Sequence, residues 1–376
     1  MITGERLMVP EWGQPAFTWI FRVLYFVHLP AVLLIQTIWP QAGGHPPWES
    51  YLVSCMSIPF IYWAAIRLLW RLYTRFNEPG EIDAGRRLFL ARSAGGAVAL
   101  TGSGLGTYGV IFEPNQLRVR RYTIGIRDLP LAMDGMRLLQ ISDTHCGPMM
   151  SMSFLHHVID QANRISADAV LLTGDYVHRT PMAVEPGIGL FNALRSRCGA
   201  VAVLGNHDHW EGKEACVAMF KQVGIPLIDN RRVYLSANGF QSEYMPDSIC
   251  VAGVGDLWCD DVLMSEALAG VPLEMPRILL SHNPDVAETM DAQHRVDLMI
   301  SGHTHGGQVR LPLLGTPIVP SRYGSKYAGG LCRGPRCRVL VSRGVGIAVL
   351  PVRFRVPPEI GLITLQKEQD SGQRNV

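Results

Sequence analysis

The sequence has little of several features that mark other classes of protein. It carries 34 Lys and Arg against 32 Asp and Glu, so its formal net charge of +2 gives no support for a nucleic-acid-binding surface. Its eight cysteines include no CxxC pair, which disfavours a zinc knuckle or a thioredoxin-like redox motif. No internal repeat and no low-complexity segment is visible. Only 18% of the residues are charged and 48% are hydrophobic, which excludes a disordered chain.

The cysteines leave the redox compartment open. Cys332 and Cys337 are close enough in sequence to form a disulfide if their segment is exported. Two free thiols near a turn are an equally good interpretation.

The first third of the chain contains two long apolar runs, at residues 17–39 and 51–73. Each has about the length needed to cross a bilayer, and Trp and Tyr gather at their ends, as at membrane interfaces. Two buried helices of a soluble domain are the alternative, but the apolar character on all faces favours membrane spans. Neither run contains an acidic residue, which disfavours an ion channel or transporter.

A third segment, residues 85–112, decides on which side of the membrane the rest of the chain lies. Arg86 and Arg87 precede a Gly-rich and Ala-rich apolar run, a pattern similar to a twin-arginine export signal. A re-entrant or interfacial segment is another possibility, and we favour a third membrane span. The link at residues 40–50 lacks Lys and Arg, and the positive-inside rule then places it outside the cytoplasm. A third crossing would put everything after residue 112 outside as well.

From about residue 119 the pattern changes to short β-rich runs that alternate with helical periodicity. This alternation predicts an α/β architecture. We expect strands at residues 136–142, 168–173, 200–204, 249–254, 277–280 and 298–301, and helices at 151–166, 184–197, 211–224 and 285–293.

Five short polar clusters follow these predicted strands. They are Asp143-Thr144-His145, Gly174-Asp175, Gly205-Asn206-His207-Asp208, Ser281-His282 and Gly302-His303-Thr304-His305. Functional sites of open α/β sheets gather at the carboxyl ends of the strands. We therefore expect the five loops to converge on one site.

The clusters supply a mixed set of metal ligands: Asp143, His145, Asp175, Asn206, His282, His303 and His305. Carboxylate, imidazole and amide groups together suit Mn, Fe or Zn better than Mg or Ca. Seven side chains are too many for one tetrahedral ion and fit two ions that share one carboxylate. Such a pair binds a phosphoryl group and generates an attacking hydroxide, so the pattern predicts phosphoester chemistry.

In this order the motifs closely resemble the calcineurin-like metallophosphoesterase superfamily. The matching blocks are DTH at 143–145, GD at 174–175, GNHD at 205–208, SHNPD at 281–285 and GHTH at 302–305. The segments at 302–312 and 341–365 are typical of a bacterial branch whose esterase domain follows a membrane or twin-arginine segment. The resemblance covers about residues 119–365 and implies a sandwich of two β-sheets flanked by helices.

The resemblance also implies a role for each residue. Asp143, His145, Asp175 and His305 would hold the first metal, and Asp175, Asn206, His282 and His303 the second, with Asp175 bridging. His207 would act as a general acid or bind the phosphate, and Asp208 would orient the His207 ring or raise its pKa. Cys146 departs from the aliphatic residue usual after the first motif, and a small packing residue is its expected role.

Together these patterns predict a membrane region at residues 1–112 with two to three transmembrane helices, a catalytic domain at 113–366 and a polar tail at 367–376. We expect a dinuclear-metal phosphoesterase at the bacterial inner membrane, with an extracytoplasmic catalytic domain. Its expected substrate is a phosphodiester or pyrophosphate, first of all a lipid-linked one, and second a soluble nucleotide or sugar phosphate. A catalytically weak, membrane-anchored regulatory or binding module is the alternative. Substrate-selecting candidates, by sequence proximity alone, are His209, Trp210, Tyr323 and Tyr327.

Overall fold

The computed structural model describes residues 89, 93, 96, 101–102 and 104–368. Contacts divide the chain into two units, Met1–Tyr108 and Gly109–Val376. The membrane spans predicted at 17–39 and 51–73 lie outside the described residues, as does much of the segment 85–112. Within the described part, no helix has both the length and the apolar character that a bilayer crossing requires.

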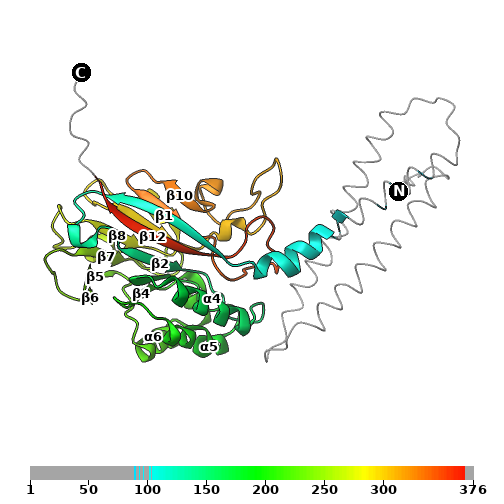
Figure 1. The fold of residues 1–376 in the computed structure, drawn as a ribbon, viewed down its shortest axis with the longest axis horizontal. Coiled ribbons are helices and arrows are strands. Elements are labelled where there is room, and N and C mark those ends of the chain that lie inside the picture. Colours follow the sequence, from blue (N-terminus) through cyan, green and yellow to red (C-terminus); the bar gives the residue numbers. More distant parts are fainter. Residues whose placement is uncertain (1–88, 90–92, 94–95, 97–100, 103, 369–376) are drawn as a thin grey trace, which may run out of the picture. The chain divides into compact units, whose positions relative to one another are not determined.

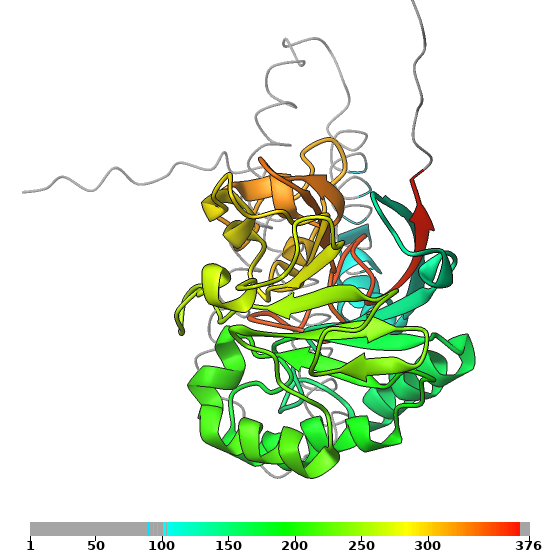
Figure 2. The ribbon, with the colours of Figure 1, turned by 90° about the vertical axis from the view of Figure 1, so that its left-hand side faces the viewer.

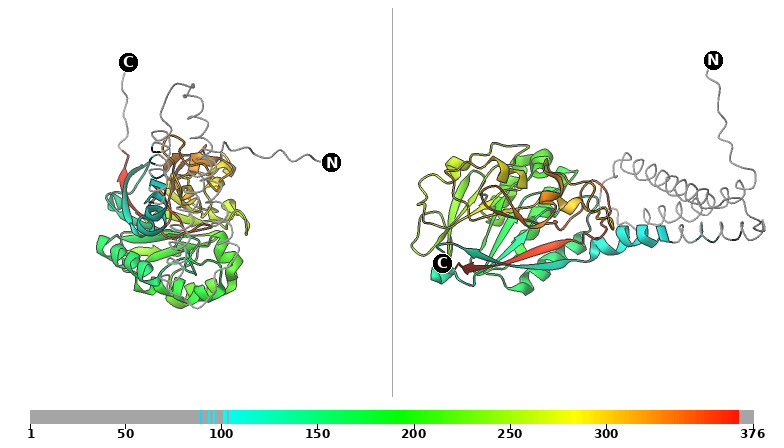
Figure 3. Two further views of the ribbon diagram at one scale, coloured as in Figure 1. Left: turned by 90° about the vertical axis from the view of Figure 1, so that its right-hand side faces the viewer. Right: turned by 90° about the horizontal axis from the view of Figure 1, so that it is seen from above.

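The second unit contains a first sheet of five strands in the order β1-β12-β2-β3-β4. The last strand of the chain, β12, lies between β1 and β2, parallel to the former and antiparallel to the latter. Figures 1 and 3 show β1 and β12 side by side although they lie at opposite ends of the described sequence. The bounds are β1 (Arg118–Ile126), β2 (Arg137–Ile141), β3 (Ala169–Thr173), β4 (Ala200–Val203) and β12 (Glu359–Lys367).

A second sheet has seven strands in the order β10-β11-β9-β8-β7-β5-β6. Its central strands β7, β8, β9 and β11 are parallel, so their carboxyl ends meet at one edge. The bounds are β5 (Arg231–Ser236), β6 (Gly239–Gln241), β7 (Ile249–Gly253), β8 (Arg277–Leu280), β9 (Leu298–Ser301), β10 (Gly330–Arg333) and β11 (Arg338–Val341).

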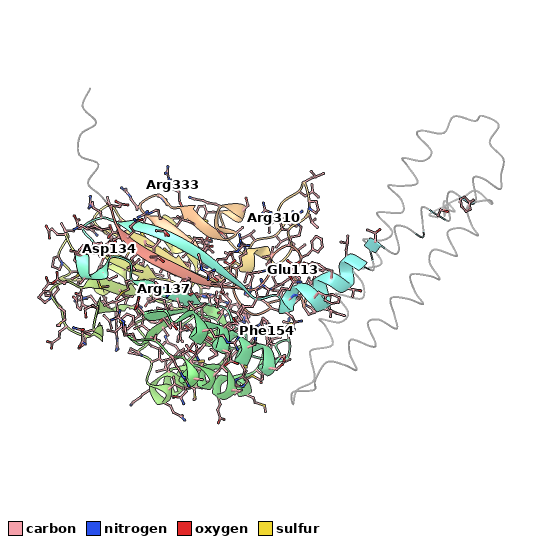
Figure 4. All side chains as sticks on the ribbon, in the orientation of Figure 1. Glu113, Asp134, Arg137, Phe154, Arg310 and Arg333 are labelled. Atoms are coloured by element: carbon pink, nitrogen blue, oxygen red, sulfur yellow. The ribbon has the colours of Figure 1, made fainter. Side chains whose placement is uncertain are left out.

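Helices cover the outer face of the first sheet. They are α4 (Met152–Ile165), α5 (Val184–Gly189) and α6 (Asn206–Val223), and Figures 1 and 2 show them on one side of the strands. In α4 the apolar residues recur at helical spacing, and five of them are buried against this sheet, among them Phe154, which Figure 4 labels. The helix ends at Ile165, and Ser166 after it adopts the left-handed conformation common at helix ends.

Three apolar clusters give the unit its layers. One lies between the two sheets and contains residues such as Leu138, Leu171, Ile278 and Leu298. A second packs α4–α6 on the first sheet. The third covers the outer face of the second sheet, beneath α7 (Met264–Ala267) and the 3₁₀ segment Pro284–Thr289. The expected α/β sandwich of two sheets with flanking helices is therefore confirmed.

Several local predictions were wrong in extent. The helix expected at 184–197 ends as α5 at Gly189 and continues only as the 3₁₀ segment Leu190–Ala193, because Pro186 and two glycines shorten it. The helix expected at 211–224 begins earlier, at Asn206. The helix expected at 285–293 is a 3₁₀ segment, Pro284–Thr289. Cys332 and Cys337 are both free, so the disulfide interpretation was wrong.

Candidate metal centre

The backbone is unusual at five of the seven predicted ligands. Asp143, His145, Asp175, His303 and His305 all have positive φ, between 44° and 72°. Residues with a Cβ rarely adopt this left-handed region, and each such residue costs about 1–3 kcal/mol where the structure enforces it. Strain gathered at five loop residues is typical of a functional site.

Two glycines let the loops approach one another closely. A Cβ at Gly205 would lie 2.3 Å from Oδ1 of Asp175, and a Cβ at Gly302 would lie 2.0 Å from Oγ of Ser142 and 2.3 Å from Oδ2 of Asp143. Any larger residue at either position would push the carboxylate of a predicted ligand aside.

One group of ligand atoms gathers around Asp143. The Nε2 atoms of His145 and His305 are 2.8 Å apart, and they lie 3.9 Å and 3.2 Å from Oδ1 of Asp143. All three side chains are buried. They form one of three groups in the described part of the chain whose ligand atoms lie close enough to share an ion.

A second group gathers around Asp175. Its Oδ2 lies 3.1 Å from Nε2 of His282, and His282 Nε2 in turn lies 3.3 Å from Nδ1 of His303. The same Oδ2 is 3.6 Å from Nε2 of His145, which belongs to the first group. The carboxylate of Asp175 therefore lies between the two groups.

The chemistry of the buried atoms fits two divalent ions. Oδ1 of Asn206 has no hydrogen-bond partner in the described structure although the side chain is buried, and the same holds for Nε2 of His303. Buried polar atoms are rarely left without a partner. A mixed donor set of carboxylate, imidazole and amide suits Mn, Fe or Zn.

The electrostatics of the site favour ligand-ready protonation states at His145, His303 and Asp175, whereas at His282 the carboxylate of Asp175 outweighs burial and raises the pKa well above its usual range. Burial, assisted by the charge of His305, lowers the pKa of His145 well below its usual range. Burial and His282 lower the pKa of His303 to about 3. Burial alone would raise the pKa of Asp175, but His282 and His145 outweigh it and hold that pKa well below its usual range. Neutral imidazole and ionised carboxylate are the forms that bind metal.

His207 lies beside the two groups and has an unexpected partner. Its Nδ1 is 2.9 Å from Nδ1 of His178, and its ring stands edge-on to that of His145 with centroids 4.8 Å apart. Its backbone N–H donates to Oδ1 of Asp175. His178 was missed in the sequence, although its position three residues after Asp175, in the same loop, was an available signal.

Asp208 is buried, and its hydrogen bonds go to backbone amides. Oδ2 accepts from the N–H groups of Asp175 (2.8 Å) and Gly205 (2.9 Å), and Oδ1 accepts from those of Tyr176 (2.8 Å) and Val177 (3.3 Å). The carboxylate thereby fastens two of the ligand-bearing loops together. The predicted action of Asp208 on the His207 ring stays a prediction.

Two exposed tryptophans border the site. Trp210 stands edge-on to His207 and Trp258 edge-on to His303, with centroid distances of 4.7 Å and 4.4 Å. The two indole rings face each other at 6.3 Å. Trp258 was also missed, because none of the five polar clusters follows β7.

The other predicted substrate-selecting residues, and Cys146, lie outside the two ligand groups. His209 packs near Asp260, 4.0 Å away, while Tyr327 is buried and donates to Glu288. Tyr323 is exposed and lies edge-on to Tyr327. Cys146 is buried, and burial raises the pKa of its thiol to about 11, as expected of a packing residue.

Comparison with known proteins shows which family this chain resembles. Residues 136–307 match the family model described as calcineurin-like phosphoesterase. The chain is 33% identical to an uncharacterized metallophosphoesterase, YkuE, of Bacillus subtilis, over 75% of this chain and 97% of that protein. It is 30% identical to the phosphodiesterase YaeI of Escherichia coli, over 74% of this chain and 98% of that protein. A transmembrane protein with metallophosphoesterase domain from Danio rerio is 29% identical, over 86% of this chain and 75% of that protein.

Proposed function

This chain belongs to the calcineurin-like phosphoesterase family, and from that premise we propose that it is a membrane-anchored, dinuclear-metal phosphodiesterase. Family membership makes it a metal-dependent hydrolase. The finer assignment concerns the substrate, a phosphodiester or pyrophosphate, and its presentation at a membrane. The relatives named as a phosphodiesterase and as transmembrane proteins support both parts.

The position of Asp175 is the observation that carries the dinuclear assignment. One of its oxygens faces His145 of the first group and His282 of the second, at 3.6 Å and 3.1 Å. We assign the first ion to Asp143, His145, Asp175 and His305, and the second to Asp175, Asn206, His282 and His303. Two divalent ions, once bound, supply positive charge for a phosphate and lower the pKa of coordinated water.

The chain's own residues supply positioning and proton transfer. His207 lies next to both groups. Burial lowers the pKa of its ring and so disfavours the charged form, whereas the nearby carboxylates of Asp175 and Asp143 favour that form. With its Nδ1 held by His178, its other nitrogen is free to face a leaving oxygen and donate a proton there. Trp210 and Trp258 border the site through edge-on contacts with His207 and His303.

The membrane part of the proposal rests on sequence. We infer that residues 1–112 anchor the chain in a bacterial inner membrane, with the catalytic unit outside the cytoplasm. A reporter fused after Phe112 tests the sidedness, because alkaline phosphatase is active only outside the cytoplasm. An active fusion supports the proposal and an inactive one overturns this part of it.

Hydrolysis of bis(p-nitrophenyl) phosphate with added Mn²⁺ tests the activity. The unaltered chain should turn over, and Asp175→Asn and His207→Ala should each lose at least about 100-fold in kcat, as expected when a charge or a proton donor is removed. Equal rates in all three proteins would contradict the assignment. No turnover by the unaltered chain would instead favour the regulatory or binding module.

A further inference from the structure

One end of the catalytic unit carries exposed apolar side chains from three separate segments. These segments are 109–112, 309–323 and 347–355, and we call their shared surface the apolar end. Leu314 and Ile318 each expose 77% of their surface, and Leu313 is fully exposed. The other exposed apolar members are Ile111, Phe112 and Val349. An exposed apolar group of this kind marks an interaction site more often than a plain surface does.

Contacts join the three segments. The N–H of Arg353 donates to the carbonyl of Gly109 at 2.9 Å, which ties the first segment to the third. Val309 pairs with Phe354 in a parallel bridge, and the N–H of Arg310 donates to Phe354 at 2.8 Å, which ties the second segment to the third. Figure 4 labels Glu113 and Arg310 at this end of the unit and Asp134 at the other.

The charge of the apolar end has one sign. Residues 109–112, 309–323 and 347–355 contain no Asp and no Glu. Arg310, Arg322 and Arg355 are exposed, and none of them forms an ion pair with any residue that the structure describes. Exposed apolar side chains accompanied by unpaired arginines suit an interface whose surface is anionic and whose interior is apolar.

The apolar end is directly continuous with the metal centre. Three residues separate His305 from Val309, and the side chain of Gln308 between them bonds to Ala348 and Leu350 of the third segment. On the other side, Arg179, which follows His178, donates to the carbonyl of Val349 at 3.2 Å. A surface that covers this end would therefore lie close to the reacting phosphate.

We propose that the apolar end docks on the surface of an anionic lipid bilayer, so that the metal centre acts on phosphoesters that the bilayer presents. The chain itself points to this occupant, since the unit begins at Gly109, downstream of two apolar runs of bilayer length at residues 17–39 and 51–73. The choice of lipid phosphoester rests on the proposed hydrolase function, whereas the docking does not.

Photocrosslinking in the full-length chain tests the docking without using activity. A benzophenone amino acid replaces Leu314 in protein reconstituted in vesicles of phosphatidylcholine and phosphatidylglycerol, and mass spectrometry counts lipid adducts. Leu131 is the matched control, because it is 78% exposed. It follows the carboxyl end of β1, a strand of nine residues whose two ends lie roughly 30 Å apart. We expect at least about fivefold more lipid adducts at 314 than at 131. Equal lipid adducts, or adducts to protein in place of lipid at 314, would overturn the proposal.

A pair of substrates with the same leaving group tests the consequence for catalysis. These are phosphatidyl-p-nitrophenol in vesicles and bis(p-nitrophenyl) phosphate in solution. Replacing both Leu313 and Leu314 by Asp should slow the lipid substrate at least about fivefold and leave the soluble one unchanged, while Leu131→Asp should change neither. Equal loss on both substrates, or no loss on either, would contradict the proposal.

The two experiments separate the two hypotheses. If the unaltered chain hydrolyses neither substrate but still forms lipid adducts at 314, the proposed function fails and the docking stands. If it hydrolyses the soluble substrate and forms no lipid adducts, the docking fails alone. Replacing Arg310 and Arg355 by Gln should remove the preference for phosphatidylglycerol over phosphatidylcholine among the adducts, and an unchanged preference would overturn the electrostatic part.

Discussion

The two sheets of the catalytic unit contribute to the metal centre in different ways. Loops of the first sheet carry both carboxylates and the amide of the ligand set, with one imidazole, whereas loops of the second carry three imidazoles. We call the loops of the first sheet the first half of the site and those of the second sheet the second half. The first half is held together internally, since the carboxylate of Asp208 accepts from backbone amides of two of its loops. The second half is braced onto the first: Nδ1 of His282 contacts the carbonyl of Thr173 at 2.8 Å, and the N–H of His303 donates to Asp143.

Because of this asymmetry, the position of the second half depends on the first half, but not the reverse. Damage to the bracing of the first half should reach both ligand groups, because the second half takes its position from the first. Damage within the second half should stay local. The predictions below test this difference.

Asp208→Asn should have the largest effect. Whichever oxygen becomes an amide nitrogen, at least one buried N–H loses its acceptor, so we expect the free energy of unfolding to fall by about 3–5 kcal/mol. Hydrogen exchange of the β3 amides in the full-length chain measures this fall, and kcat should fall more than about 100-fold.

The matched control in the second half is Asp285→Asn. Asp285 is also buried, but among the residues that the structure describes its carboxylate accepts only from the Ser321 hydroxyl and the Arg322 N–H. Its loss should leave kcat within about tenfold of the unaltered protein. Equal effects of the two substitutions would show that the halves do not differ.

The junction between the halves should respond to pH through Asp229. This residue lies on the connection from α6 to β5, and its carboxylate accepts from the N–H of Leu204 at the end of β4. Burial raises the pKa of Asp229 to about 7, above the value of about 3.9 for an unfolded chain. The folded protein therefore holds this proton more tightly, and the resulting stability is complete below pH 4 and is lost as the pH rises through 7.

Asp229→Asn should remove that pH dependence. Because Asp229 keeps some contact with solvent, we expect the fall in unfolding free energy between pH 4 and pH 8 to shrink by about 2 kcal/mol. Hydrogen exchange of β4 amides at several pH values measures it. The same fall in the variant and in the unaltered chain would exclude Asp229 as its source.

Much of this division of the ligands between the loops of the two sheets was predictable from sequence. The strands expected at 277–280 and 298–301 coincide with β8 and β9, and the polar clusters after the strands converge as expected. These elements are short apolar runs with a sharp polar end, which period and composition identify well. Strand β12 was not expected as such, because its pairing between β1 and β2 depends on contacts about 220 to 240 residues apart in sequence.

The partners of His207 could not be predicted for a physical reason. Neighbouring residues on a helix point in different directions. Since α6 begins at Asn206, His207 and Asp208 lie within its first turn: Asp208 turns toward backbone amides, and His207 turns toward His178. Motif spacing identified the residue types but not the directions in which the side chains of His207 and Asp208 point.

His178 should contribute to catalysis as a positioning residue for His207, which also lies in the first half. Replacing it by Phe removes the partner of His207 Nδ1, and we expect kcat to fall about tenfold, with KM and metal content unchanged. His178→Asn places an amide near the lost nitrogen and should restore part of kcat. A fall in metal content, or no rescue by Asn, would indicate a structural role instead.

Gln140 should show the smallest effect and tests the link between the halves directly. Its buried side-chain nitrogen donates to Oγ1 of Thr173 at 3.0 Å and to the carbonyl of Ser301, at the end of β9, at 2.8 Å. Gln140→Met removes both bonds, but Ser301 keeps the N–H of Ser342 as a donor, so the cost should be only about 1 kcal/mol. Thr173→Val removes the bond within the first sheet and keeps the crossing bond. Faster hydrogen exchange of the β9 amides in Gln140→Met, but not in Thr173→Val, would show that the second half is positioned through the first, whereas equal exchange in both would mean that β9 holds its place through the second sheet alone.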